Sequence, residues 1–283
     1  MSPAPFTETP AGVRMPQLLY GTAWKAQQTA DCVKRALQAG FRGIDTACQP
    51  KHYHEPGAGE GIAEFLAAAD SVTRQDLYLQ TKFTSLSGQD PRRVPYDARA
   101  PLSEQVTQSL QASLRNLRTD YIDCWVLHSP MPRERDTLSV WRVMEQAVEQ
   151  GFVRQLGISN CYDERVLTRL CAQARVQPSV LQNRFYADTG YDKGLRALCR
   201  SQRIVYQSFW TLTANPRVLA HAVVASLCVQ YGSTPAQIFF RYLTQEGIVP
   251  LTGTQSLEHM REDLACFAFT LSDKERAAIS ALL

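Results

Sequence analysis

Short apolar runs that resemble buried strands alternate with amphipathic, helix-like runs along the whole 283-residue chain. This alternation is typical of a parallel sheet whose strands are joined by crossover helices. The strand-like runs are residues 17–21, 43–46, 77–81, 122–127, 153–158, 180–182, 204–207 and 248–251. Eight such units, in a chain close to the roughly 250 residues of a one-domain barrel, predict an α/β fold of the (β/α)8 TIM-barrel class.

The composition fits one large barrel. Hydrophobic residues make up 45% of the chain and charged residues 20%, as expected for a protein with a sizeable core. No second domain is needed, so we assign residues 15–283 to a single barrel. Residues 1–14 contain three prolines, and we expect this extension to be poorly ordered or to lie across the bottom of the barrel.

Charge and cysteine content exclude several other classes of protein. The net charge of +3 is too small to favour nucleic acid or an acidic membrane surface as a partner. Eight cysteines without a CxxC pair favour reduced thiols over a disulfide framework. There is no signal-peptide pattern, and no apolar stretch approaches the roughly 18 residues of a membrane span. We therefore expect a cytoplasmic protein, and we expect it to be a monomer.

Four polar residues lie at or just beyond the ends of strand-like runs. They are Asp45 in GFRGIDTA, Tyr53 in KHYHE, Lys82 in YLQTKF and His128 in IDCWVLHSP. The strands of a parallel barrel all end at one face, where barrel enzymes keep their chemistry, so the fold would gather these side chains there. They are the candidate catalytic residues.

These residue types suit proton transfer to a carbonyl group. A phenol, with a reference pKa of about 10, is a weak acid near neutral pH unless a neighbouring ammonium lowers that pKa. Tyr53 is the candidate acid and Lys82 the candidate ammonium. Asp45 would hold Lys82 charged and in place, and the imidazole of His128 would orient the carbonyl.

Several stretches from about Met15 to the C-terminus resemble one known family. They are MPQLLYGTAWK, GFRGIDTA, LQTK, LRTDYIDCWVLHSP, GFVRQLGISN, VLQNRFY and STPAQIFFRYL. In this order they are similar to segments of the aldo-keto reductases, which are (β/α)8 barrels that use NADPH without a Rossmann domain. The resemblance implies NADPH-dependent reduction of a small aldehyde or ketone.

The resemblance also implies a cofactor site. Ser159, Asn160 and Gln182 match residues that hydrogen-bond the nicotinamide carboxamide. Phe209 matches a tyrosine whose ring stacks on the nicotinamide, and a phenyl ring can stack in the same way. The remaining implied cofactor residues are Gly21, Thr22, Trp210, Leu212, Leu251, Thr252, Thr254, Arg261 and Asp263.

The phosphate-binding segment departs from the family pattern. Leu251 stands where relatives usually have a lysine, so one cation is missing. Recognition of the phosphates would then depend on Arg261 and on the hydroxyls and backbone of Thr252 and Thr254. We expect NADPH to be used, with weaker discrimination against NADH.

The substrate pocket is expected to contain Trp24, Tyr96 and Ser129. Ser129 stands where the family commonly has tryptophan, which predicts a wider pocket beside the catalytic histidine. Residues 84–100 interrupt the alternation with one glycine and two prolines, and so predict a long loop at the catalytic end.

Tyr53 is itself displaced from the usual pattern. It follows Asp45 by eight positions, whereas the family interval is five, as if residues 49–51 had been inserted. The loop must therefore bulge to bring the phenol to the site. This departure leaves open an NADP(H)-binding barrel with little turnover, acting as a sensor or regulatory subunit. A Schiff-base lyase acting through Lys82 also remains open.

Two local patterns resemble a metal site and a dinucleotide-binding motif, but neither matches the spacing that such a site needs. Cys48, His52, His54 and Glu55 are metal-ligand types, but their spacing matches neither a CxxC knuckle nor an HExxH helix, so we expect no metal. The segment GAGEG at 57–61 resembles a dinucleotide-binding fingerprint. Because Ile62 stands in place of the third glycine, a tight helix start explains it better.

Overall fold

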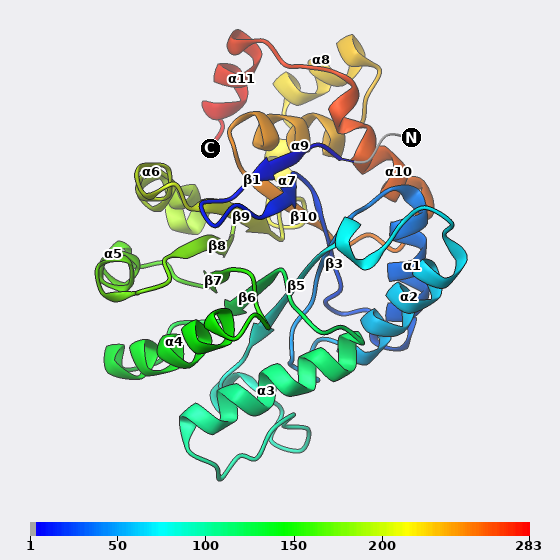
Figure 1. The fold of residues 1–283 in the computed structure, drawn as a ribbon. Helices are drawn as coiled ribbons and strands as arrows, with labels where there is room; N and C mark the ends of the chain where they lie inside the picture. The colour runs from blue at the N-terminus through cyan, green and yellow to red at the C-terminus, as the bar shows by residue number, and fades with distance from the viewer. Residues whose placement is uncertain (1–3) are drawn as a thin grey trace.

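The computed structural model describes residues 4–283, and its main feature is a closed barrel of parallel strands (Figure 1). The barrel strands follow chain order from β3 to β10, and β10 pairs back onto β3. They are Leu19–Gly21 (β3), Gly43–Asp45 (β4), Tyr78–Phe83 (β5), Cys124–Leu127 (β6), Leu156–Ser159 (β7), Pro178–Arg184 (β8), Val205–Phe209 (β9) and Val249–Thr252 (β10). Each overlaps a predicted run, so the prediction of a (β/α)8 barrel is confirmed.

Helices surround the barrel (Figure 1). They are Thr29–Ala39 (α1), Glu55–Ala68 (α2), Leu102–Leu117 (α3), Glu134–Glu149 (α4), Glu164–Gln173 (α5), Lys193–Gln202 (α6), Pro216–Leu219 (α7), Ala222–Tyr231 (α8), Pro235–Gln245 (α9), Leu257–Ala265 (α10) and Asp273–Ser280 (α11). The periodicity of α3 explains its packing, because Val106, Leu110 and Leu117 lie on one face and are buried. Gly40, with φ of 118°, ends α1 in the left-handed conformation that glycine tolerates.

The glycines of GAGEG lie inside α2. A side chain at Gly59 would overlap the backbone oxygen of Asn116 at the end of α3, and one at Gly61 would overlap the backbone of Ala30 in α1. Because the glycines lack side chains, α2 packs closely between its two neighbours. Helix packing thus accounts for the motif without a nucleotide.

A hairpin of β1 (Phe6–Glu8) and β2 (Arg14–Pro16) precedes the barrel. Its turn residue Thr9 donates a hydrogen bond of 2.5 Å from Oγ1 to Oε1 of Gln155, which directly precedes β7. The hairpin (blue in Figure 1) therefore covers the amino-terminal end of the strands. Residues 4–14 therefore do not form a poorly ordered extension, because strand pairing holds them. Residues 1–3 lie outside the described residues.

The predicted loop at residues 84–100 contains only a short 3₁₀ turn at Leu86–Gly88. It contacts the bulge that precedes Tyr53 on the neighbouring βα loop. Gln49 donates from Nε2 to the backbone oxygen of Gly88 at 2.7 Å, and Gln89 donates to that of Cys48 at 2.9 Å. These two contacts hold the bulged loop against its neighbour.

Two further findings bear on the expected environment of the protein. Within residues 4–283, no helix combines the length and the apolar character needed to cross a membrane. All eight cysteines, which lie in the same range, are free thiols.

Candidate active site

A cavity of about 940 Å³ opens at the carboxyl ends of the barrel strands. The predicted residues that line it are Gly21, Trp24, Asp45, Tyr53, His128, Ser159, Asn160, Gln182, Phe209, Trp210, Leu212, Leu251, Thr252, Thr254 and Asp263. The barrel therefore brings most of the predicted catalytic and cofactor residues around one space. Barrel enzymes use this face for catalysis.

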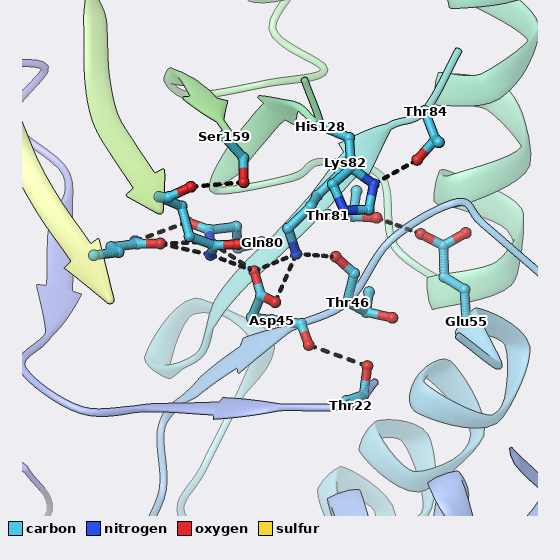
Figure 2. A network of polar contacts seen from close by, with 12 residues as sticks. Thr22, Asp45, Thr46, Glu55, Gln80, Thr81, Lys82, Thr84, His128 and Ser159 are labelled. Carbon is cyan, nitrogen blue, oxygen red and sulfur yellow. Dashed lines mark hydrogen bonds and ion pairs between the residues drawn. The ribbon is translucent and has the colours of Figure 1, made fainter. Parts of the chain in front are cut away.

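Lys82 and Asp45 form a buried ion pair beneath the cavity (Figure 2). Nζ of Lys82 lies 2.7 Å and 2.6 Å from the two carboxylate oxygens and 2.8 Å from the backbone oxygen of Thr46. All three N–H groups of the ammonium are therefore used. Lys82 is 1% exposed and does not itself line the cavity.

Three glutamines that the sequence did not single out as a group complete this pair. Asp45 Oδ1 also accepts hydrogen bonds from Gln80 at 2.7 Å and from Gln182 at 3.0 Å, and both amides donate to Gln207. Gln80 and Gln207 come from strand positions that the barrel turns inward, which sequence spacing alone does not reveal. The amides add neutral hydrogen-bond donors around the Asp45 carboxylate.

Tyr53 reaches the ion pair in spite of its displaced position in the chain. Nζ of Lys82 lies 5.3 Å from the centre of the Tyr53 ring, and the ring centres of Tyr53 and His128 are 6.0 Å apart. The ammonium thus faces the ring, and its hydrogen bonds go to Asp45 and Thr46. Burial, and then the charge of Asp45, raise the pKa of Tyr53. The expected lowering of this pKa by Lys82 is not seen in the described arrangement.

His128 is held as a neutral imidazole. Its Nδ1 lies 2.6 Å from Oγ1 of Thr84, as Figure 2 shows. Burial, followed by the positive charge of Lys82, lowers the pKa of His128 to about 3. The other ring nitrogen, Nε2, has no partner among the described residues and is free to bind a ligand in the cavity.

The bulge after Asp45 contributes two residues that sequence reasoning did not assign to the site. Gln49 and His52 both line the cavity. The His52 ring stacks on that of Trp24, with centres 3.9 Å apart, and the Trp24 amide donates to the His52 backbone oxygen at 2.8 Å. The Trp24 side chain remains 63% exposed. The inserted residues thus build one wall of the cavity.

Two predicted pocket residues lie elsewhere. Ser129 is exposed, does not line the cavity, and donates from Oγ to the backbone oxygen of His128 at 2.8 Å. Tyr96 is buried under the 84–100 loop, where its hydroxyl donates to the backbone oxygen of Thr84 at 2.7 Å. Both side chains lie outside the cavity, because the backbone turns after His128 and the loop folds back on itself, and their contact with a substrate stays a prediction.

Two predicted cofactor residues also lie outside the cavity. Arg261 lies on the exposed side of α10 and does not line the cavity, so its role in phosphate recognition stays a prediction. Thr22 is fully buried and donates to the backbone oxygen of Asp45 at 3.1 Å, which makes it a support for the strand end (Figure 2).

The donors around the cavity fit a phosphate-bearing nicotinamide nucleotide. Within residues 4–283, the lysine and arginine side chains that line the cavity are Lys25 and Arg184, respectively. Neither forms an ion pair with a described carboxylate. Lys25 is buried, and a buried ammonium without a carboxylate suits an anionic ligand. Phe209, Ser159 and Asn160 also line the cavity. The same residues contain no cluster of three metal-ligating side chains.

A parallel barrel with a lysine–aspartate pair, a phenol and a neutral imidazole at its carboxyl end belongs to the class of barrel enzymes. Residues 17–283 match the model of the aldo/keto reductase family. The chain belongs to this family, as the resemblance in its sequence predicted, and it is an NAD(P)H-dependent oxidoreductase.

Similar proteins extend over the whole chain. It is 30% identical to a methylglyoxal reductase, DkgA, of Yersinia pestis, over 100% of this chain and 94% of that protein. The structure of a Bombyx mori aldo-keto reductase (AKR2E4) in complex with NADP superimposes with a TM-score of 0.85 at 27% identity, covering 99% and 92% of the two chains. An aldo/keto reductase from Brucella melitensis gives a TM-score of 0.84, also at 27% identity, covering 99% and 100%. Members of this family are thus solved with NADP(H) bound, and NADP(H) is the cofactor of this chain.

Proposed function

We propose that this protein reduces an aldehyde or ketone to the alcohol with NADPH, and that Tyr53 is the proton donor. The observation that carries the proposal is the convergence of Tyr53, His128 and the Lys82–Asp45 pair at one end of the cavity. Three segments of the chain contribute these groups: residues 45–53, Lys82 on β5 and His128 after β6.

The chemistry follows from the state of each group. Bound NADPH supplies a hydride to the carbonyl carbon. The raised pKa keeps the Tyr53 phenol protonated, so it holds a proton for the carbonyl oxygen as negative charge develops there. The ammonium of Lys82, 5.3 Å from the ring centre, stabilises the phenolate that remains. The products are the alcohol and NADP⁺, and solvent returns a proton to Tyr53.

His128 orients the carbonyl in this proposal. A Thr84 hydroxyl that donates to Nδ1 places the imidazole hydrogen on Nε2, which then donates to the carbonyl oxygen. The pKa of about 3 keeps the ring neutral, so it leaves the proton transfer to Tyr53.

The two alternatives have less support. A Schiff base requires a free amine, but the Lys82 ammonium donates three hydrogen bonds and does not line the cavity. A binding protein without turnover was suggested by the long interval between Asp45 and Tyr53. The bulge at residues 49–52 compensates for that interval, because Tyr53 still reaches Lys82 and His128.

The test is NADPH consumption with a panel of carbonyl compounds, including methylglyoxal, followed in wild-type protein and in Tyr53→Phe. We expect the substitution to reduce kcat by about 100-fold to 10,000-fold, the usual contribution of a positioned acid, with unchanged affinity for NADPH. Tyr121→Phe, outside the cavity, is the matched control. Full activity in Tyr53→Phe would show that another group donates the proton. Borohydride trapping of a substrate on Lys82 would favour the lyase.

The monomeric state and the cytoplasmic location stay predictions. Sedimentation at micromolar concentration should give a mass near the 31.7 kDa of the chain.

A further inference from the structure

Arg184 brings a positive charge to the cavity without a partner for its guanidinium. It lines the cavity and is half-buried at the end of β8. Its backbone amide donates to the Tyr162 hydroxyl at 3.2 Å, but its side chain forms no hydrogen bond or ion pair with any residue in 4–283. Nε is buried and still has no acceptor. Because a guanidinium has five N–H donors and no acceptor, an anion in the cavity would suit it best.

Two aromatic rings hold this guanidinium in place. Its central carbon lies 4.3 Å from the centre of the Trp210 ring and 5.2 Å from that of Tyr186. Trp210 has a positive φ of 54°, which is uncommon for a residue other than glycine. Strain of this kind collects at ligand sites. Stacking also limits the orientations of the guanidinium, so less conformational freedom is lost when it binds a ligand.

Arg184 lies above the position that the proposed function gives to the nicotinamide. The family resemblance assigns the carboxamide to Ser159, Asn160 and Gln182. Arg184 follows Gln182 by two residues on β8, so the two side chains share one face of the strand, and Arg184 lies about 6.6 Å nearer its carboxyl end. The cavity opens at that end. The part of a substrate that extends away from its reacting carbonyl would therefore pass Arg184.

The cofactor supplies no anion at this end of the cavity. The nicotinamide ring and its carboxamide carry no negative charge, and the oxidised ring is a cation. By the family resemblance, the phosphates belong near Thr252 and Thr254, on β10 and the loop that follows it. In the barrel, β9 separates β10 from β8. An anion that contacts Arg184 is therefore expected to come from the substrate.

We propose that Arg184 binds a carboxylate on the substrate, so that the enzyme prefers aldehydes or ketones that carry a second, acidic group. This inference rests on the proposed function, which places the carbonyl group beside Tyr53 and His128. A carboxylate accepts two parallel N–H bonds from a guanidinium, which an ester or an amide cannot match in charge or geometry. Binding at both ends of the substrate would hold the carbonyl in position for hydride transfer.

The experiment compares charged and neutral aldehydes of similar size. Succinic semialdehyde is paired with its methyl ester, and para-carboxybenzaldehyde with para-formylbenzamide. In the wild type, the carboxylate of each pair should be the better substrate. We expect Arg184→Met to lower kcat/KM for the carboxylates by about tenfold to hundredfold, mainly through KM, because a charged hydrogen bond is lost. The neutral compounds should change by less than about twofold.

Arg196→Met is the matched control. Arg196 is also half-buried, lies over an aromatic ring, that of Phe185, and has a buried Nε without a partner, but it does not line the cavity. This variant should match the wild type with all four aldehydes. Thermal unfolding checks that both variants fold. If Arg184→Met does not, Arg184→Lys replaces it, and the carboxylates should still lose more than the neutral compounds, because lysine keeps the charge without the planar fork.

Calorimetric titration with NADPH separates a substrate role from a cofactor role. Arg184→Met should bind NADPH within about twofold of the wild type. Weaker NADPH binding, with equal losses on charged and neutral aldehydes, would assign Arg184 to the cofactor and overturn the inference. Equal changes within each pair at unchanged NADPH affinity would also overturn it, while leaving the proposed function intact. A wild type that reduces no carbonyl compound would overturn the proposed function and this inference together.

Discussion

The amide of Gln80 occupies an unusual place for a polar residue, since barrel interiors are mostly filled by branched apolar side chains. It accepts from the Tyr78 hydroxyl at 2.9 Å and donates to Asp45 at 2.7 Å. Tyr78 in turn accepts from Gln155, which binds Thr9 of the hairpin. A continuous chain of hydrogen bonds therefore crosses the barrel from its covered end to the ion pair. Gln80 is the residue that joins this chain of hydrogen bonds to Asp45.

Replacing Gln80 by leucine should lower both stability and activity. The substitution removes the acceptor of the buried Tyr78 hydroxyl and one hydrogen-bond partner of the Gln207 amide, which costs about 1–3 kcal/mol of unfolding free energy. It also removes one donor from Asp45. Urea denaturation and kcat measure the two effects. Gln38→Leu, on the exposed face of α1, should change neither; equal effects in both variants would mean that the buried amide has no special role.

His128 gives the protein a pH dependence with a definite sign. Its folded pKa of about 3 lies below the unfolded value of about 6.5. Below pH 6.5 the unfolded chain binds a proton at His128, and the folded protein does not. His128 therefore makes the unfolding free energy fall as pH decreases towards 3. Above pH 6.5 it has no effect. The slope contributed is at most about 1.4 kcal/mol per pH unit.

Denaturation measured from pH 4 to pH 8, in steps of about one pH unit, separates the effect of His128 from those of other groups. In His128→Gln, the unfolding free energy should fall less steeply below pH 6.5 than it does in the wild type. A His128→Gln profile parallel to the wild type would show that the imidazole is protonated equally in both states.

At the scale of elements, α2 depends on its glycines for close packing between α1 and α3. Alanine is normally the better helix former, by about 1 kcal/mol over glycine. At Gly59 we expect the reverse, because a methyl group would overlap the Asn116 backbone oxygen, and overpacking costs about 1–3 kcal/mol. Chemical denaturation of Gly59→Ala decides the sign. A stabilised variant would mean that α2 and α3 can separate without loss.

The bulge after Asp45 and the 84–100 loop contact each other. The bulge after Asp45 lengthens the path to Tyr53, and the 84–100 loop accepts the bulge through Gln49 and Gln89. Neither loop has regular structure of its own. Their mutual hydrogen bonds place the phenol and the Trp24–His52 wall.

For the whole molecule, the two ends of the barrel have separate tasks. The hairpin of β1 and β2 covers the amino-terminal end, and the cavity opens at the carboxyl end. Deletion of residues 1–13 should therefore lower the melting temperature, because Gln155 loses Thr9, while the affinity for NADPH stays within about twofold. Scanning calorimetry and nucleotide titration measure the two quantities. Weaker nucleotide binding would show that the central hydrogen-bond chain couples the hairpin to the site.

The sequence by itself determined the barrel and the residues near its strand ends. Strand and helix periods are local properties, so eight units could be counted before any contact was known. A residue at the carboxyl end of a parallel barrel strand lies at the carboxyl face of the barrel. For this reason the sequence could place Asp45 and His128 at the cavity. Lys82 was found for the same reason, although it lies beneath the cavity wall.

Tertiary structure decided everything that depends on the direction of a side chain in a loop. Ser129, Tyr96 and Arg261 have the right chemistry and sequence positions, but the backbone turns them to solvent, beneath a loop or onto an exposed helix face. Lys25 was not singled out, because nothing in its sequence surroundings predicts the two left-handed residues around it that direct its ammonium inward. Loop conformation is set by contacts with distant segments, and those contacts exist only after the barrel has closed.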